Sequence, residues 1–284
     1  MSNLVLRTIF GALFVVVLVA SMVLSAWSFV VLFALITALA VWEFSGIVNQ
    51  HAGAMVNRLQ TTTAGVYLFL AFAAYNSGLT GAEAFVPYLL FVVYLPISEL
   101  YLQKPDPLKN WAYAFAAQIY IALPFALLNT LGFVGDTLSI TSLNQYHFIL
   151  PLSIFIFLWT NDTGAYCTGS LLHKTFPAKL FERISPNKSW VGSIGGAVLS
   201  LLVAVLLNAA FPGNMSLLHW LGFALVVVIF GTWGDLVESM LKRQLGIKDS
   251  GHILPGHGGM LDRFDSMLLA VPAVVIYLYT IHFF

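Results

Sequence analysis

Long apolar stretches recur along the whole chain and are separated only by short polar breaks. A bilayer core about 30 Å thick requires roughly 20 apolar residues of each helix that crosses it, and these stretches meet that length. Of the 284 residues, 60% are hydrophobic and 8% are charged, whereas soluble domains carry about 25% charged residues. No room remains for a sizeable soluble domain. The sequence therefore predicts an all-α, polytopic integral membrane protein.

Nine spans follow from the apolar stretches and the breaks between them. Their limits are 5–24, 27–47, 60–78, 84–103, 111–133, 147–172, 190–211, 216–241 and 266–284. The breaks have turn-forming sequences, such as Asn76-Ser77-Gly78 after the third span and Phe211-Pro212-Gly213-Asn214 after the seventh. The first apolar run is longer than the core of a cleavable signal, so we expect an uncleaved first helix.

The basic residues test the count of nine independently. With nine spans, all 12 Lys and Arg residues fall on one side of the membrane: Arg7, Arg58, Lys104, Lys109, Lys174, Lys179, Arg183, Lys188, Lys242, Arg243, Lys248 and Arg263. The positive-inside rule makes that side cytoplasmic. We expect a multi-pass protein of the cell inner membrane with its N-terminus in the cytoplasm. Because 12 acidic residues balance the charge, no nucleic-acid partner is expected.

Five acidic residues fall inside predicted spans, in the half nearer the cytoplasm: Glu43, Glu99, Asp162, Asp235 and Glu238. A carboxylate in hydrocarbon costs several kcal/mol, so such residues normally face the protein interior or a wet cavity. Glu43 and Glu99 lie close to span ends, which favours helix capping or snorkelling. Asp162 lies deeper in its span and is expected to face the interior of the helix bundle.

The densest polar stretch runs from Gly231 to Asp265. Asp235 shares one helix face with Glu238 and Ser239, because these residues are three and four positions apart. Asp262 and Asp265 share a face at the start of the last span, where the helix dipole favours anions. Carboxylates hold Mg²⁺, which keeps several waters and takes further ligands from substrate phosphates. The stretch therefore indicates a metal-assisted phosphate site; the alternative is a snorkelling charged loop with acidic caps.

The same stretch contains groups that suit a triphosphate. Lys and Arg side chains neutralise phosphate oxygens. The glycines Gly256, Gly258 and Gly259 let a backbone approach a phosphate closely, with amide groups directed at it.

This segment carries a resemblance to a known family. The pattern Ser239-x-x-Lys242-Arg243-x4-Lys248-Asp249-x-Gly251-x-x-Leu254-Pro255-x-His257-Gly258-Gly259-x-x-Asp262-Arg263-x-Asp265 resembles the complete signature of the phosphatidate cytidylyltransferases. The resemblance implies a polytopic bundle, Mg²⁺ dependence, and CTP and phosphatidate as substrates. It implies that CTP and phosphatidate react to give CDP-diacylglycerol and pyrophosphate at the cytoplasmic face, in phospholipid biosynthesis.

A second similarity lies in the sixth span and the loop after it. Asn161-Asp162-Thr163-Gly164-Ala165-Tyr166 and Ser185-Pro186-Asn187-Lys188-Ser189-Trp190-Val191-Gly192 are similar to two further elements of the family. Val191 departs from the usual glutamate. The resemblance covers residues 160–284, and over residues 1–150 it rests on hydropathy alone. We expect helices 1–5 in residues 1–140 to form a scaffold with lipid access, and helices 6–9 in residues 141–284 to carry the catalytic site.

The resemblance and the charge pattern together assign roles. The expected metal ligands are Asp235, Asp262 and Asp265, which hold one or two Mg²⁺ ions, with Asp162 as a candidate ligand for a further cation. Lys242 is expected to join the three acids in catalysis. The expected substrate-binding residues are Lys188, Ser189, Ser239, Arg243, Lys248, Asp249, His257, Gly258, Gly259 and Arg263. For His257 a phosphate contact and a structural role in the loop are both open.

Residues 175–184 have the pattern of a short amphipathic helix, with Phe176, Leu180, Phe181 and Ile184 on one side and Lys179 and Arg183 on the other. Such a helix either attracts an anionic lipid headgroup or serves as an ordinary interfacial connector. Small-residue pairs such as Gly192 and Gly196 permit close helix contact, either within the chain or in a homodimer.

Three other classes of protein fit the sequence less well. A secondary transporter is expected to carry inverted repeats and broken helices in both halves, whereas here the ionisable residues crowd the second half. Another CTP-dependent membrane enzyme, such as a polyprenol kinase, shares the electrostatic logic but transfers a different phosphate. A non-enzymatic scaffold has no need of the acids in the loop.

Overall fold

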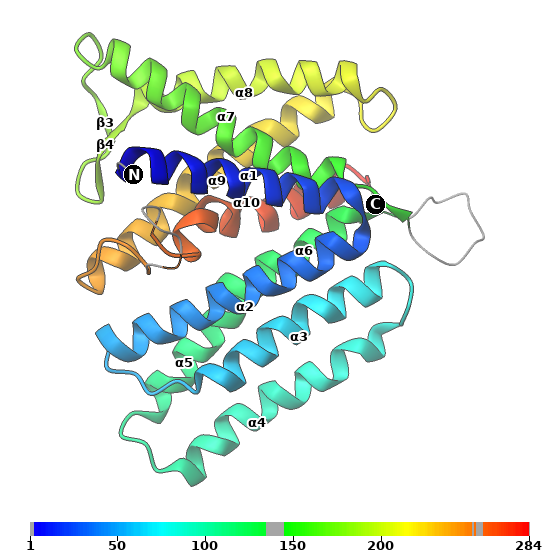
Figure 1. Ribbon diagram of the computed structural model, residues 1–284, viewed down its shortest axis with the longest axis vertical. Helices are drawn as coiled ribbons and strands as arrows, with labels where there is room; N and C mark the ends of the chain where they lie inside the picture. Colours follow the sequence, from blue (N-terminus) through cyan, green and yellow to red (C-terminus); the bar gives the residue numbers. More distant parts are fainter. Residues whose placement is uncertain (1–2, 135–144, 252, 254–257, 284) are drawn as a thin grey trace. The chain divides into compact units, whose positions relative to one another are not determined.

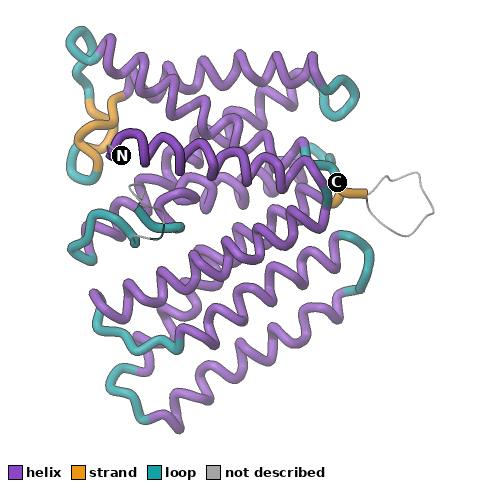
Figure 2. The backbone as a smooth tube through the Cα atoms, viewed as in Figure 1, coloured by secondary structure: helices purple, strands orange, loops and turns teal. Residues whose placement is uncertain are grey.

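The computed structural model of the chain describes residues 3–134, 145–251, 253 and 258–283 (Figures 1 and 2). The chain divides into two compact units, each built from two separate segments. The first unit contains Met1–Pro151 and Leu245–Phe264, and the second contains Leu152–Gln244 and Asp265–Phe284. Residues 245–264 hold most of the signature pattern and are called the signature loop. They belong to the first unit, although they lie about a hundred residues further along the chain than the rest of that unit.

The first unit is helical, with one small strand pair. Its elements are α1 (Asn3–Leu24), α2 (Ala26–His51), α3 (Arg58–Asn76), η1 (Ala82–Phe85), α4 (Val86–Leu102), α5 (Pro107–Ala116), η2 (Ala117–Ala122), α6 (Leu123–Gly132), β1 (Phe133–Val134) and β2 (Gln145–Tyr146). Ser25 separates α1 from α2, and its hydroxyl caps α2 by accepting a hydrogen bond from the Ser28 amide at 3.1 Å. Figure 1 shows α2, α3 and α4 side by side.

Aromatic side chains fill the interior of the first unit. Phe264 is buried, and its ring lies 5.3 Å from the Phe125 ring, 5.8 Å from the Phe14 ring and 6.4 Å from the Phe33 ring, centroid to centroid. Each such aromatic pair contributes roughly 0.5–1.5 kcal/mol beyond the area it buries. The end of the signature loop is therefore fixed to the core of this unit by one aromatic anchor.

The second unit contains most of α7 (Ile149–Leu172), β3 (Lys179–Phe181), β4 (Ser185–Ser189), α8 (Trp190–Ala210), α9 (Leu217–Gln244) and most of α10 (Leu261–Thr280). β3 and β4 pair antiparallel, with Lys179 opposite Ser189 and Phe181 opposite Ser185 (Figure 2). The amphipathic helix predicted for residues 175–184 is therefore wrong. Residues 179–181 pair with the neighbouring strand across the hairpin instead of continuing along a helix.

Small residues let α7 and α8 approach closely. A methyl group on Gly196 would meet the backbone oxygen of Asn161 at 2.5 Å, and one on Gly164 would meet the Cα of Gly196 at 2.9 Å. The Ser200 hydroxyl also donates to the Phe157 carbonyl at 3.3 Å. The small residues of the second similarity therefore serve packing within one chain, and they place Asp162 beside the start of α8.

The helices have the length and composition of membrane spans. Among the described residues, five helical stretches are long and apolar enough to cross a bilayer: Ala26–His51, Ala82–Leu102, Pro107–Gly132, Trp190–Ala210 and Leu217–Gln244. A shorter apolar stretch covers Thr8–Leu24. Each predicted span coincides with a described helical stretch. The all-α, polytopic membrane architecture is confirmed, while the count of nine crossings stays a prediction.

We expect Gly196→Ala to destabilise the protein by about 1–3 kcal/mol, because the added methyl group must push a backbone oxygen of α7 aside. Thermal unfolding of the detergent-solubilised chain measures the effect. Val198→Ala is the matched control, because Val198 lies on the same helix and is 52% exposed. Equal melting temperatures for the two variants would contradict the close contact between α7 and α8.

Candidate active site

A cavity of about 630 Å³ opens in the second unit. Three elements contribute most of its wall: the second half of α7, the hairpin β3–β4 and the start of α8. Polar side chains predominate among its lining residues, which are Asn161, Asp162, Ala165, Tyr166, Gly169, Ser170, His173, Lys179, Ser185, Asn187, Lys188, Ser189, Gly192, Ser193, Thr232, Asp235 and Ser266. So many polar groups around one cavity in so apolar a chain indicate a site for a charged ligand.

Lys188 and Asp235 form the central ion pair of this cavity. The Lys188 amine lies 2.5 Å from Oδ2 of Asp235. The Lys188 side chain is 25% exposed and the Asp235 side chain is 31% exposed, so most of each is covered by protein. The other oxygen of Asp235 accepts a hydrogen bond from the Ser239 hydroxyl at 3.1 Å. The predicted site residues Lys188, Asp235 and Ser239 are thus brought together, from β4 and α9.

Two more carboxyl groups lie close to Asp235. Asp162 on α7 and Asp265 on α10 are each near enough to Asp235 to interact with it electrostatically, and Lys242 lies within the same range of Asp265. Lys242 also pairs with Glu238, whose side chain is fully buried one turn earlier on α9. The structure therefore gathers four acidic and two basic side chains in the second unit.

The start of α8 also opens on the cavity. Ser189 caps this helix by accepting a hydrogen bond from the Gly192 amide at 3.2 Å, and Ser189, Gly192 and Ser193 all line the cavity. A helix N-terminus presents unsatisfied amides and a positive dipole end, which together favour a phosphate. Ser189 thus has a structural role in addition to the substrate-binding role predicted for it.

The donor set fits a hard divalent cation. Asn161 is 5% exposed and lines the cavity, and its side-chain oxygen has no hydrogen-bond partner among the described residues. Asp162 and Asp235 line the same cavity. Within the described residues, no three His, Cys, Asp or Glu side chains converge as a complete metal cage. Mg²⁺ needs no such cage, because one or two carboxylates with waters and substrate phosphates suffice.

The predicted ligand Asp262 belongs to the first unit. Its Oδ2 accepts hydrogen bonds from the amides of Ser250 and Gly259, both at 2.9 Å. Gly258 adopts a φ of +81°, and a side chain on Gly259 would collide with the Glu43 carboxylate and the Ser250 hydroxyl. Gly258 and Gly259, two of the glycines predicted to admit a phosphate, thus make room for carboxylates of the protein itself, and the third, Gly256, lies outside the described residues.

The remaining predicted residues lie at the ends of helices or in the signature loop. Arg243 is exposed near the end of α9, Lys248 and Asp249 are exposed in the loop, and Arg263 is exposed in the first turn of α10. His257 lies outside the described residues. The substrate-binding roles of these five residues stay predictions.

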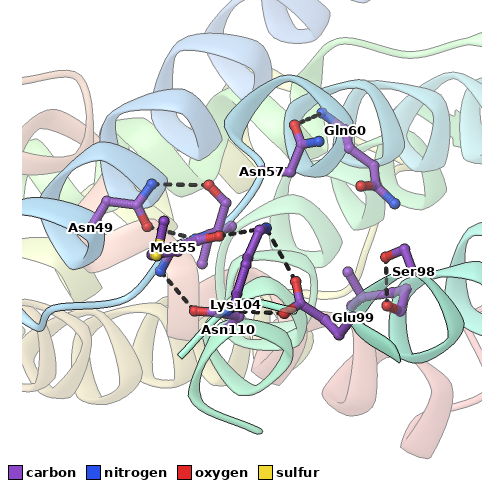
Figure 3. A network of polar contacts seen from close by, with 10 residues as sticks. Asn49, Met55, Asn57, Gln60, Ser98, Glu99, Lys104 and Asn110 are labelled. Atoms are coloured by element: carbon purple, nitrogen blue, oxygen red, sulfur yellow. Dashed lines mark hydrogen bonds and ion pairs between the residues drawn. The ribbon is translucent and has the colours of Figure 1, made fainter. Parts of the chain in front are cut away.

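Glu43 and Glu99 are the intramembrane acids that lie in the first unit. Glu99 is buried and accepts hydrogen bonds from Lys104 at 3.2 Å and Asn110 at 3.0 Å (Figure 3). Asn110 in turn accepts from the Met55 amide at 2.7 Å, so this network joins the ends of helices. Glu43 instead contacts the signature loop. Glu43 lies on α2 and caps a helix as expected, but the helix that it caps is α10.

Sequence reasoning assigned no site role to Asn161 or Ser250. Asn161 was part of the second similarity, and its position next to Asp162 in an apolar span was the available signal. Ser250 occupies a variable position of the signature pattern, so nothing in the sequence marked it.

Comparisons with known proteins identify the class. A model of the cytidylyltransferase family matches residues 5–281. A phosphatidate cytidylyltransferase of Haemophilus influenzae is 30% identical over 267 residues, which cover 90% of this chain and 91% of that protein. One of Staphylococcus aureus (strain COL) is 47% identical over 132 residues, which cover 46% of this chain and 49% of that protein.

The chain therefore belongs to the cytidylyltransferase family, and it is an enzyme of the nucleotidyltransferase class. The family resemblance predicted from the signature is confirmed.

We expect Lys188→Met and Asp235→Asn each to destabilise the folded protein, because each leaves a partly buried charge without its partner. The double variant should be less destabilised than the sum of the single variants, by on the order of 1 kcal/mol. A double-mutant cycle of thermal unfolding measures this coupling. Lys179→Met is the control, since Lys179 lines the same cavity, and it should show no coupling to Asp235→Asn. Strict additivity for Lys188 and Asp235 would contradict the ion pair.

Proposed function

We propose that the enzyme joins CTP to phosphatidate and releases CDP-diacylglycerol and pyrophosphate. The observation that carries the proposal is the Lys188–Asp235 pair in a polar cavity at the start of α8, in a chain of the cytidylyltransferase family. The relatives named phosphatidate cytidylyltransferase support the choice of the lipid substrate.

The proposed reaction is an in-line displacement at phosphorus. An oxygen of the phosphatidate phosphate attacks the α-phosphorus of CTP, and the bond from that phosphorus to the oxygen bridging to the β-phosphate breaks. The electron pair leaves with pyrophosphate. A phosphomonoester has a second pKa of about 6, so it is largely a dianion at pH 7 and needs no dedicated base. The site must therefore position two polyanions and stabilise the leaving group.

The residues of the cavity suit these tasks. Lys188 and Lys179, together with the amides at the start of α8, offer positive charge to phosphate oxygens. Asp235 orients Lys188 through their ion pair. Bound Mg²⁺ would neutralise charge on the triphosphate, held by Asp235 with Asp162 or Asp265, and Asp262 stays a proposed further ligand.

The remaining parts of the proposal concern the membrane. The one-sided distribution of the 12 basic residues supports a cytoplasmic active site and N-terminus in a cell inner membrane. Lys242, Arg243, Lys248 and Arg263 are proposed to hold the CTP phosphates from that side.

The identity of the product decides between this function and its rival. Detergent-solubilised protein with phosphatidate, CTP and Mg²⁺ should release pyrophosphate and form a CDP-lipid, as read by mass spectrometry. A polyprenol kinase would form a lipid monophosphate and CDP instead. Release of CDP without a CDP-lipid would overturn the proposed reaction.

We expect Asp235→Asn to lower kcat at saturating CTP by about 100-fold or more, because it removes a carboxylate that orients Lys188 and is proposed to hold Mg²⁺ at the reacting phosphates. Asp106→Asn is the control. Asp106 also pairs with a lysine, Lys109, at 2.8 Å, but it belongs to the first unit. Near-normal turnover of Asp235→Asn in folded protein would remove Asp235 from the site.

A further inference from the structure

One carboxylate of the first unit is bound entirely to the segment that contains the signature. Glu43 lies on α2 and is 7% exposed. Its Oε2 accepts a hydrogen bond from the Met260 amide at 2.9 Å, and its Oε1 accepts one from the Leu261 amide at 3.1 Å. The Ser250 hydroxyl also donates to Oε1. All of these donors lie more than 200 residues further along the chain.

Helix geometry explains why an acid is needed at this place. α10 begins at Leu261, and the first amides of a helix have no acceptor within the helix. A carboxylate there satisfies the amides and interacts favourably with the positive end of the helix dipole. Glu43 is thus an N-terminal cap supplied by a different helix. It fixes the residue at which α10 begins.

A second carboxylate completes the same network. Asp262 accepts from the amides of Ser250 and Gly259, while its own amide donates to the Ser250 hydroxyl at 3.3 Å. Ser250 therefore bonds to both Glu43 and Asp262. Gly259 has no space for a side chain, because the Glu43 carboxylate and the Ser250 hydroxyl occupy it. The position of Asp262 depends on Glu43 in two ways. Glu43 binds the amides of the two residues that precede Asp262, and it also binds the Ser250 hydroxyl, which accepts from the Asp262 amide.

We propose that Glu43 is a positioning residue for nucleotidyl transfer. It is not among the described residues that line the cavity, and it acts by holding the start of α10, on which Asp262 and Asp265 lie three residues apart. The inference rests on the proposed function, because that function gives these two aspartates their roles. A displacement of catalytic groups by about 1 Å can cost on the order of 100-fold in rate, so the rigidity of this cap bears directly on turnover.

Glu43→Gln tests the inference with little change in shape. The amide of glutamine retains one acceptor oxygen and replaces the other with an NH₂ group, which cannot accept from a backbone amide. Glu99→Gln is the matched control. Glu99 is also 7% exposed and bonded to several donors of the first unit, and it makes none of these bonds to the signature loop.

Two measurements on the full chain in detergent are needed. Hydrogen–deuterium exchange of peptides covering residues 258–265 should be faster in Glu43→Gln and unchanged in Glu99→Gln. Each variant is assayed equally far below its own melting temperature. Under these conditions Glu43→Gln should lower kcat by about tenfold or more, because the acids are misplaced, while Glu99→Gln retains turnover close to wild type. Unchanged exchange in Glu43→Gln, or equal losses of turnover in both variants, would overturn the inference.

Ser250→Ala keeps the test decisive if Glu43→Gln does not fold. This substitution removes one donor to Glu43 and the acceptor for the Asp262 amide. Ser98→Ala is the control, because the buried Ser98 hydroxyl donates to the Leu95 carbonyl at 2.8 Å. The kcat of Ser250→Ala should fall measurably below that of Ser98→Ala. Equal kcat values for the two serine variants would count against the role of Glu43. Wild-type protein that forms no CDP-lipid would instead overturn the proposed function itself.

Discussion

A carboxylate in an apolar protein is stable only where donors or cations surround it, and this requirement organises both units. Desolvating such a group costs several kcal/mol unless it is paired or hydrogen-bonded. Glu43 takes its donors from the signature loop, Glu99 from Lys104 and Asn110, and Glu238 from Lys242. The Glu43 and Glu99 pairings join different elements, and the Glu238 pairing joins two successive turns of α9. The polar groups thus determine which backbone segments are fixed.

The second unit combines charges of both signs in two ion pairs, of which Lys188–Asp235 lines the cavity. Lysines alone would attract a triphosphate but would repel one another in its absence. With Asp235 paired to Lys188 and Lys242 paired to Glu238, the cations are already oriented before a ligand arrives. Such preorganisation reduces the cost of rearrangement when charge develops at the reacting phosphates. Under the proposed function, the ion pairs therefore serve both the stability of the fold and the chemistry of the site.

Much of the fold and part of the candidate site could be predicted from the sequence. Apolar runs located the helices to within a few residues, because a bilayer imposes their length, and spacing on α9 placed Asp235 beside Ser239. The hairpin β3–β4 was missed because the apolar and basic residues of 175–184 recur at helical intervals, whereas the sequence does not mark the pairing of residues 179–181 with residues 185–189. The partners of Glu43 were beyond sequence reasoning, since they depend on tertiary contact between α2 and a loop over 200 residues away.

The capping of α10 by α2 has a consequence for biosynthesis. A ribosome makes Glu43 long before Ser250, Met260 and Leu261, which are 207 to 218 residues later. Throughout that interval the nascent α2 carries an acid whose final donors do not yet exist, while later helices enter the lipid one after another. The first unit is therefore completed only after residues 245–264 have emerged. Truncated products that end before Ser250 therefore lack all three of the donors that bind Glu43.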